Sequence, residues 1–388
     1  MPLDILATAV VEGTDKIPFW REIRALAPYV AGITAVKLWT RGSINQWGRK
    51  LHGKVYIVTG ATTQGMGTAV ALEMAEQGAQ LIILVKKVDE WTTEWVEDLR
   101  SRAKNELIYL EQCDLSDLYQ VRKFATKWLD NKPARRLDGV VAMAGNLEPV
   151  WNSTRKASTD GLELQMAVNF AGHFHLLDLL KPAFKAQPPD RDVRIVVTTC
   201  MLQAIGDVRL EDPLWRDAKY DRPLKFFASS KLQLGLCMLE LQRQLFSNAK
   251  KDDGTTGRNV TVTLVQPGIM RSTSLRRLIS NGSVLALLFL YSFLLYPLLW
   301  LFTKSGYRGG QSVLYALMTP ELEEVNLKDD QVKYVVNCSM GGFSRKEFGD
   351  AELQKKLYDT TSQKILELER SMAIKRNTGK KKAAAAGK

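Results

Sequence analysis

The first residues that could do chemistry form a glycine-rich run at positions 59–67, which reads Thr-Gly-Ala-Thr-Thr-Gln-Gly-Met-Gly. Glycines let the backbone approach a phosphate closely, and a helix N-terminus at the same place attracts the anion. The run follows an apolar segment at 55–58 and opens a helical pattern at 68–77 that ends before Gly78. In that context it predicts a dinucleotide-binding loop. Its binding residues are expected to be Gly60, Thr63, Gln64, Gly65, Met66 and Gly67.

The residues after the next apolar segment bear on which dinucleotide is bound. An acidic residue there would bind the ribose 2′-hydroxyl of NAD, whereas a basic residue favours the 2′-phosphate of NADP. Residues 81–85 are followed by Lys86 and Lys87, and the first carboxylate is Asp89. We therefore expect NADP(H) in preference to NAD(H), with Lys86 at the phosphate. The alternative is that both lysines are simply solvated.

The elements that must position these residues alternate regularly along the chain. Apolar, strand-like segments are separated by helical ones, which is typical of a doubly wound parallel sheet. The strand-like segments are residues 55–58, 81–85, 107–113, 139–143, 193–199, 260–265 and 332–336. The sequence therefore predicts a single α/β, Rossmann-type domain over 51–340. An N-terminal extension would cover 1–50, and a C-terminal helix with a basic tail would cover 341–388.

One segment departs from the alternation, because residues 284–302 are 19 residues without a charge. That length is within the range for crossing a bilayer, and an apolar surface on all sides favours contact with lipid. Strand-like segments lie on both sides of it, so a single crossing would separate strands of one sheet. We expect an apolar membrane insertion, either a re-entrant hairpin bent near Tyr296 and Pro297 or an interfacial helix. The uncharged residues 25–36 either pack on the domain or lie at a membrane surface.

Composition limits the classes of function and the compartment. Asp4 and Glu12 interrupt the start, so no signal peptide is expected and the protein is not expected to be secreted. We expect a membrane-associated protein with its sheet domain in the cytosol, at the endoplasmic reticulum or a lipid droplet surface. The net charge of +12 includes a basic tail that is expected to be disordered, and the other basic residues are dispersed, so no nucleic-acid partner is expected. Neither the four cysteines nor the three histidines have metal-site spacing, so no metal is expected.

Further motifs, in chain order, carry a family resemblance. They are Leu51-His52-Gly53-Lys54-Val55, Cys113-Asp114-Leu115, residues 164–174 around Asn169, residues 227–232 before and after Lys231, and Gln266-Pro267-Gly268 with Arg271-Ser272. From Leu51 to Asn337 the chain resembles a short-chain dehydrogenase/reductase of the retinol-dehydrogenase-like branch. The resemblance implies a catalytic role for Asn169 and Lys231. It also implies cofactor contacts for Asp114, Leu115, Gly145, Lys231, Pro267, Gly268 and Ser272.

The resemblance further implies a reaction and an assembly. In the family a tyrosine phenol passes the proton while hydride moves on the nicotinamide, and a lysine lowers the phenol pKa and holds the ribose. A serine binds the substrate oxygen, and an asparagine supports a water relay. The substrate here would be a lipophilic carbonyl or alcohol, because residues 284–302 fall where the family builds its substrate lid. Homodimerisation through the helices bearing Asn169 and Lys231 is a family expectation, while a membrane-attached member can be monomeric.

Departures from the family pattern concentrate at the chemistry. Four residues separate Gly60 from Gly65, one more than usual, and the family's Asn-Asn-Ala-Gly motif reads Ala142-Met143-Ala144-Gly145, without its polar support. Phe227 stands at the tyrosine position, and phenylalanine has no proton to give. Loss of a positioned general acid or base typically costs about 10²–10⁴-fold in rate.

The serine position is also altered, since Cys200 occupies it and Thr199 precedes it. Thr199 could replace the serine hydroxyl after a small backbone shift, and Cys200 could donate weakly. Tyr220 would need a folded-back loop to reach the site. Two hypotheses stay open. The chain is either an active NADP(H)-dependent oxidoreductase, or a silent member that binds NADP(H) and serves as a membrane-attached interaction or sensing protein.

Overall fold

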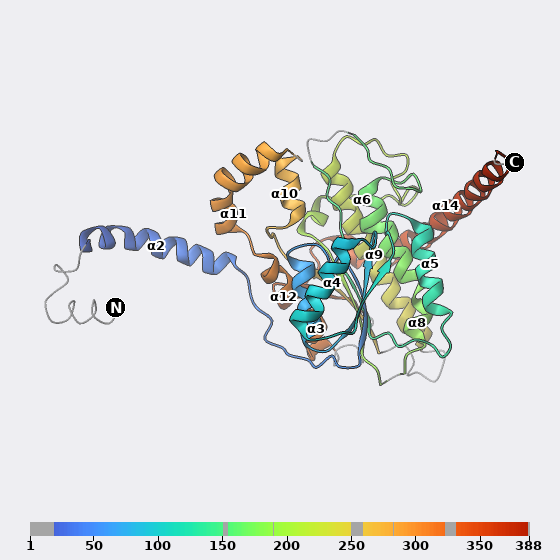
Figure 1. Cartoon of the computed structure of the whole chain (residues 1–388), viewed down its shortest axis with the longest axis horizontal. Helices are drawn as coiled ribbons and strands as arrows, with labels where there is room; N and C mark the ends of the chain where they lie inside the picture. Colours follow the sequence, from blue (N-terminus) through green and yellow to red (C-terminus); the bar gives the residue numbers. More distant parts are fainter. Residues whose placement is uncertain are drawn as a thin grey trace.

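The arrangement of the chain comes from a computed structural model (Figure 1). It describes residues 19–149, 154–188, 190–249, 259–281, 283–322 and 331–386. The described chain forms one sheet with helices packed against both faces. The N-terminal helix α2 (Trp20–Thr40) and the end of the C-terminal helix α14 (Ala351–Ala386) project from this body on different sides (Figure 1).

The sheet has eight strands in the order β3-β2-β1-β4-β5-β6-β7-β8. The neighbours from β3 to β7 pair in parallel, and β8 pairs with β7 in the antiparallel sense. The seven strands expected from the sequence are confirmed, and β8 is an addition. The bounds are β1 Val55–Thr59, β2 Gln80–Val85, β3 Ile108–Gln112, β4 Gly139–Ala142, β5 Val193–Thr198, β6 Val260–Gln266, β7 Lys333–Val336 and β8 Ser339–Gly341.

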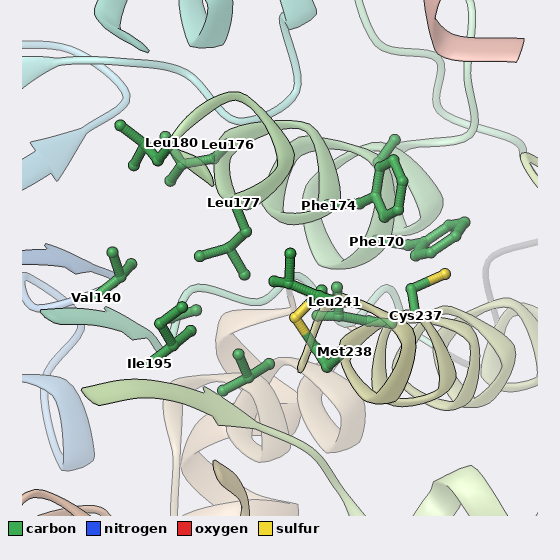
Figure 2. Packing of buried hydrophobic residues seen from close by; sticks show 14 of the residues in the cluster. Val140, Phe170, Phe174, Leu176, Leu177, Leu180, Ile195, Cys237, Met238 and Leu241 are labelled. Carbon is green, nitrogen blue, oxygen red and sulfur yellow. The ribbon is translucent and has the colours of Figure 1, made fainter. Parts of the chain in front are cut away.

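The central strands β1, β2, β4 and β6 are buried and mostly apolar because helices cover both faces of the sheet. Successive strand residues point to opposite faces of the sheet, so each strand contributes side chains to two separate hydrophobic cores. One core joins the sheet to α5, α7, α9 and α14, and the other joins it to α3, α4 and α12. Figure 2 shows part of the first core, where apolar side chains of α7 and α9 face one another beside Val140 and Ile195.

The helices that make up these layers follow the order expected for the fold. Aspartates cap two of them, Asp89 at α4 and Asp117 at α5, through acceptor oxygens that receive first-turn N–H groups. The helix after the glycine run begins at Met66, slightly earlier than the sequence pattern indicated. The principal bounds are α3 Met66–Glu76, α4 Glu90–Ala103, α5 Leu118–Leu129, α7 His173–Leu179, α9 Pro223–Ala249 and α12 Gly306–Met318. Shorter pieces are α6 Leu164–Met166, the π-helix η2 Ala167–Gly172, α8 Lys181–Lys185, η3 Met201–Ile205, α10 Thr273–Ser280 and η5 Lys346–Gly349.

The apolar segment at 284–302 is divided into two helical pieces. They are the π-helix η4 (Ala286–Leu295) and α11 (Tyr296–Phe302), with Pro297 in the first turn of α11. Tyr291 is the one buried residue of these two pieces. Within the part of the chain that the structure describes, no helix is both long enough and apolar enough to cross a bilayer. The insertion expected from the sequence is therefore not confirmed.

Two terminal segments also bear on expectations from the sequence. Helix α2 contains the uncharged residues 25–36 and buries none of its residues, so this stretch does not pack into the domain. Its last turn contacts α11, where Lys37 Nζ donates to the carbonyls of Trp300 at 2.5 Å and Thr303 at 3.1 Å. At the other end, α14 continues as a helix to Ala386, where we expected a disordered tail. Alanine, lysine and arginine are strong helix formers, which accounts for the difference.

Candidate functional site

The glycine run connects β1 to α3 and lies close against the end of β4. Gly60 has φ of 73°, and a Cβ added there would lie 2.6 Å from the Cα of Ala144. A Cβ on Gly67 would lie 2.0 Å from the carbonyl oxygen of Gly60. Gly65, with φ of 111°, precedes the first residue of α3, Met66. Only glycine fits these positions, so the loop keeps an open backbone of the kind that a dinucleotide phosphate approaches.

Polar support for this loop comes from residues that the sequence did not single out. The hydroxyl oxygen of Thr59 accepts hydrogen bonds from the backbone N–H groups of Met143 and Ala144, both at 3.1 Å. Its hydrogen is then available to Nε2 of His173 at 3.0 Å, and Nδ1 of His173 lies 2.9 Å from the carbonyl of Val168. Burial, together with the charge of Lys231, lowers the pKa of His173 to about 3, so the ring is neutral. The altered motif at 142–145 is therefore supported from Thr59 and His173, and our expectation of lost support was wrong.

A cavity of about 300 Å³ opens in front of the glycine run. It contains three of the residues predicted to bind the dinucleotide, Thr63, Gln64 and Gly145. Its other lining residues were not predicted, because apart from Thr62 of the glycine run they come from α4, from the loop after β4 and from α10, which the topology alone brings to this place. These are Thr62, Trp91, Asn146, Leu147, Thr273, Ser274, Arg276 and Arg277.

The residues expected at the adenosine side lie at the ends of β2 and β3. Lys86 Nζ is 3.5 Å from Oδ2 of Asp114, and the Lys86 side chain is 77 % exposed. Oδ1 of Asp114 accepts from the backbone N–H of Ser116 at 2.9 Å and from its hydroxyl at 2.7 Å. Leu115 is buried against Gly172, where an added Cβ would meet the Leu115 carbonyl. An exposed pair of this kind contributes little to stability, so Lys86 is free to meet a ligand phosphate.

Asn169 is fully buried in η2, and its amide is used in positioning. Its Oδ1 accepts from the backbone N–H of Asn146 at 2.7 Å, and its Nδ2 donates to the Asn146 carbonyl at 2.9 Å. The same Nδ2 lies 3.2 Å from the hydroxyl of Ser230, which in turn donates to the carbonyl of Phe227 at 2.7 Å. Asn169 therefore joins the loop after β4 to the helix that carries Lys231.

Lys231 and Phe227 share one face of α9 at the inner end of the site. Lys231 is buried, and its Nζ donates to the carbonyl of Thr198 at 3.1 Å. Burial lowers the pKa of Lys231 to about 8, with the nearby Cys200 acting in the opposite direction. A Cβ on Gly145 would lie 3.7 Å from Lys231 Nζ and 3.6 Å from Oδ1 of Asn169, so the structure brings these three predicted residues together.

At the position of the catalytic serine, the Thr199 hydroxyl is already hydrogen-bonded to another side chain and the Cys200 thiol is a weakened acid. The Thr199 hydroxyl donates to Oε1 of Gln203 at 2.6 Å, and Nε2 of Gln203 donates to the Tyr334 hydroxyl at 3.1 Å. Tyr334 donates in turn to Gln266. Burial raises the pKa of Tyr334 to about 12, and burial likewise raises the pKa of the Cys200 thiol. Neither Thr199 nor Cys200 is therefore poised as an acid, and Tyr334 was not foreseen from the sequence.

Tyr220 does not come to the lysine. Its ring packs against Phe226 with centroids 5.0 Å apart, and its buried hydroxyl has no hydrogen-bond partner among the described residues. Burial raises its pKa to about 12, and the acting charges are those of Glu163, Glu148 and Arg155. Its hydroxyl makes no hydrogen bond with Lys231, whose Nζ donates to the Thr198 carbonyl, so Tyr220 does not take the place of the missing phenol.

The turn expected over the nicotinamide is present after β6. Gly268 has φ of 89°, and the carbonyl of Pro267 accepts from Lys304 Nζ at 3.4 Å. Ser272 caps α10 by accepting from the N–H of Leu275 at 3.2 Å. The backbone of Lys304 pairs with Ile269 and Arg271 at 3.0 Å each. The segment 272–303 therefore leaves the sheet domain and returns to it at the same place, beside the turn after β6.

Comparison with known proteins agrees with this geometry. The profile of the short chain dehydrogenase family matches residues 54–206. The chain is 63 % identical to an uncharacterized oxidoreductase of Saccharomyces cerevisiae, over 98 % of this chain and 96 % of that one. It is 30 % identical to retinol dehydrogenase 13 of Mus musculus and to retinol dehydrogenase 14 of Homo sapiens, in each case over 80 % of this chain and 85 % of the relative.

Solved structures agree on the fold. A crystal structure of a protein from Mycobacterium paratuberculosis matches with a TM-score of 0.55 at 23 % identity, over 84 % of this chain and 97 % of that one. The glycine run, the buried asparagine and lysine, and the strand order point the same way as the sequence relatives. The chain belongs to the short-chain dehydrogenase/reductase family of NAD(P)-binding oxidoreductases, in the branch that contains the retinol dehydrogenases.

Proposed function

We propose that the chain is an NADP(H)-dependent oxidoreductase that interconverts a lipophilic carbonyl and its alcohol at a membrane surface. The observation that carries this proposal is that the glycine run at 59–67 lies beside Gly145, which in turn lies next to buried Lys231 and Asn169. A nicotinamide dinucleotide supplies the hydride when it is bound. Gly60 and Gly67 admit its phosphates to the backbone, and exposed Lys86 favours a 2′-phosphate on its ribose.

Lys231 is the group we assign to proton transfer, because Phe227 has no proton and Thr199 donates to Gln203. A lysine with a pKa near 8 is protonated at neutral pH and can release that proton. When bound, the reduced dinucleotide would supply hydride to the carbonyl carbon, and Nζ of Lys231 would give its proton to the carbonyl oxygen. The neutral amine then regains a proton from water through the cavity.

Contact with lipid is proposed from the exposed apolar surface of α2 and of residues 284–302. Phe293 is 81 % exposed, Phe289 is 68 % and Trp39 is 84 %. A large apolar surface of this kind marks a site of interaction. Residues 259–320 contain no acidic residue, and their five basic residues favour an anionic lipid surface. These residues are Arg271, Arg276, Arg277, Lys304 and Arg308.

Residues 284–302 would form a lid over the site that lies in the membrane surface and does not cross the bilayer. Such a lid would admit substrate directly from the membrane. We further propose that the sheet domain faces the cytosol, at the endoplasmic reticulum or a lipid droplet. The four cysteines are unpaired, which fits a reducing compartment.

The second candidate is a catalytically silent protein that binds NADP(H) and serves as a membrane-attached interaction or sensing protein. The observation that favours it is the engagement of Thr199 with Gln203, together with Phe227 at the tyrosine position. Neither the residue at the tyrosine position nor Thr199 would then offer a free hydroxyl to polarise a substrate oxygen.

The test is a titration of the purified full chain with NADPH and NADH, followed by assays with lipophilic aldehydes and ketones. We expect tighter binding of NADPH, and turnover that is lost in Lys231→Met and kept in Lys225→Met, a control on the same helix. Binding of NADPH without turnover in the wild type, with turnover appearing in Phe227→Tyr, would favour the silent candidate. Absence of binding by either dinucleotide would overturn both.

A further inference from the structure

We propose that Arg276 and Arg277 of α10 bind the phosphate groups of the dinucleotide, so that the helix leading into the apolar segment acts as a clamp on the cofactor. This inference rests on the proposed function, because it names residues of this chain that would hold the same ligand. Neither arginine belongs to a motif that carries the family resemblance. Only the tertiary structure brings them to the glycine run.

The lining of the cavity has the chemistry of an anion site. Arg276 and Arg277 share it with the hydroxyls of Thr62, Thr63, Thr273 and Ser274, and no carboxylate belongs to the lining. Among the described residues, neither guanidinium has a hydrogen bond or a salt bridge, and none of the four hydroxyls donates a hydrogen bond to the protein. Two adjacent cations repel each other unless an anion lies between them. Guanidinium groups also match phosphate oxygens in geometry.

The carboxylate that feels the charge of Arg277, Glu148, does not form an ion pair with it. Glu148 is buried and bonded to others, with its Oε2 2.7 Å from Lys156 Nζ and its Oε1 3.0 Å from Nδ2 of Asn146. Burial alone would raise the pKa of Glu148, but these two hydrogen bonds and the charges of Lys156 and Arg277 lower it. Arg277 therefore acts on Glu148 only through its charge, and its donors stay available to a ligand.

The clamp is physically continuous with the apolar segment. The guanidinium carbon of Arg276 lies 6.0 Å from the ring centre of Tyr291, the buried residue of η4. Such a cation–π contact ties the position of the arginine to the position of η4. Closing the clamp on phosphate would therefore order α10 and fix the base of the lipid-facing lid.

The experiment measures affinity in the full chain purified in detergent, with NADPH and with 2′-phospho-ADP-ribose, which carries the phosphates without the nicotinamide. The test variant is Arg276→Gln/Arg277→Gln. The control is Lys355→Gln/Lys356→Gln, which removes the same charge from exposed positions on α14. We expect the Kd for both probes to rise about tenfold or more in the test variant and to change less than about twofold in the control. Hydrogen exchange over 273–280 should slow when 2′-phospho-ADP-ribose binds the wild type, and should not slow in the test variant.

The outcomes separate this inference from the proposed function. Normal affinity for both probes in Arg276→Gln/Arg277→Gln would overturn the clamp and leave the proposed function standing. An equal loss in the α14 control would also overturn it, because net charge alone would then explain the effect. If the wild type binds neither probe, the proposed function itself fails. Should the glutamine variant unfold, Arg276→Lys/Arg277→Lys keeps the charge, and an unchanged Kd in both that variant and single glutamine variants would contradict the bidentate contact.

Discussion

The role of Lys231 depends on the residue at position 227, where the family pattern has a tyrosine and this chain has phenylalanine. With phenylalanine at position 227, the buried ammonium of Lys231 is left beside Asn169 and the carbonyl of Thr198. Burial destabilises its charge, which lowers its pKa to about 8. The family resemblance assigns Lys231 to the ribose, whereas the proposed function assigns it proton transfer on the basis of these surroundings.

The pH dependence of turnover follows from that value. Reduction needs protonated Lys231, so kcat/KM for carbonyl reduction should be constant below about pH 7 and fall tenfold per pH unit well above pH 8. Oxidation of the alcohol needs the neutral amine and should show the opposite trend. A pH–rate profile in both directions measures this. A reductive profile that stays flat through pH 9 would assign the proton to another group.

A second prediction at this scale concerns Thr59, whose hydroxyl accepts two backbone N–H groups and donates to His173. Thr59→Val keeps the shape but leaves both buried N–H groups without that acceptor. The Met143 N–H also donates to the Thr59 carbonyl at 3.3 Å, so the Ala144 N–H is the one left without an acceptor. We expect a loss of about 1–3 kcal/mol in the free energy of unfolding, measured by urea denaturation. The control Thr126→Val, at an exposed position on α5, should change stability by less than about 0.5 kcal/mol. Equal stability of the two variants would remove the proposed support of the loop.

At the scale of elements, α14 completes the core on one face of the sheet by packing on α7 and α9. The ring of Tyr358 meets Phe174 edge-on at 4.8 Å, and its hydroxyl donates to Asp178 at 2.5 Å. These helices are the ones through which the family resemblance implied homodimerisation. Any dimer through α7 and α9 would have to accommodate α14, so the homodimer stays a prediction.

The docking of α14 should depend on pH through Glu369. Burial acts to raise its pKa, but hydrogen bonds from His175 and Arg122 outweigh burial and lower the pKa to about 2. The folded value lies below the unfolded value near 4.5, so the stabilisation is present above pH 4.5 and is lost as the pH falls toward 2. Protection factors of the α14 amides, which correct for the intrinsic exchange rate, should fall as the pH is lowered from about 5 to about 3. Glu369→Gln should remove this dependence and Glu367→Gln, at an exposed position of the same helix, should keep it.

The apolar segment yields a prediction about lipid binding. Phe289 and Phe293 are exposed in η4, and burial of a phenylalanine side chain is worth about 1.5–3 kcal/mol. Phe289→Gln/Phe293→Gln should therefore reduce binding to vesicles of phosphatidylcholine and phosphatidylserine by about a hundredfold or more. The control Leu107→Gln/Leu129→Gln removes two exposed apolar residues elsewhere and should bind normally. Vesicle flotation measures both, and equal binding by all three proteins would contradict docking through η4.

At the scale of the whole molecule, the lipid-facing surface and the cofactor cavity are connected through α10. Lys37 and Arg271 both donate to carbonyls at the end of α11, so α2, α11 and the turn after β6 form one assembly. Arg271 Nη1 lies 2.9 Å from the Thr303 carbonyl, at the base of the lid. If the apolar segment docks on lipid as proposed, we expect the docking to bias the position of α10, which follows Arg271 directly in the chain.

Reciprocal coupling is the expected consequence, because two ligands that favour one conformation must favour each other. Anionic vesicles should lower the Kd for NADPH about five- to tenfold, and NADPH should strengthen vesicle binding by the same factor. Titrations of NADPH with and without vesicles measure one direction, and flotation with and without NADPH measures the other. Independence of the two equilibria would show that the lid and the cavity are not linked.

Much of the fold was determined by local sequence. Apolar segments of strand length between helical patterns specified seven strands and their parallel pairing, since only a sheet covered on both faces buries such segments. The glycines at 60 and 67 were readable because their spacing is set by backbone geometry at a strand-to-helix turn. Asn169 and Lys231 were identified only through the resemblance to the family's motifs, and the structure places both in buried positions. The departure at Phe227 was equally visible, since a missing phenol needs no structure to be noticed.

Other features were decided only by the tertiary structure, because they depend on contacts between residues far apart in the chain. The Thr59–His173 pair, the Tyr334–Gln203–Thr199 chain and the arginines of α10 at the cavity join segments more than a hundred residues apart. The apolar segment is the clearest case. Its composition indicated contact with lipid, whereas its division into η4 and α11 and its contacts with α2 follow from packing that no local pattern encodes.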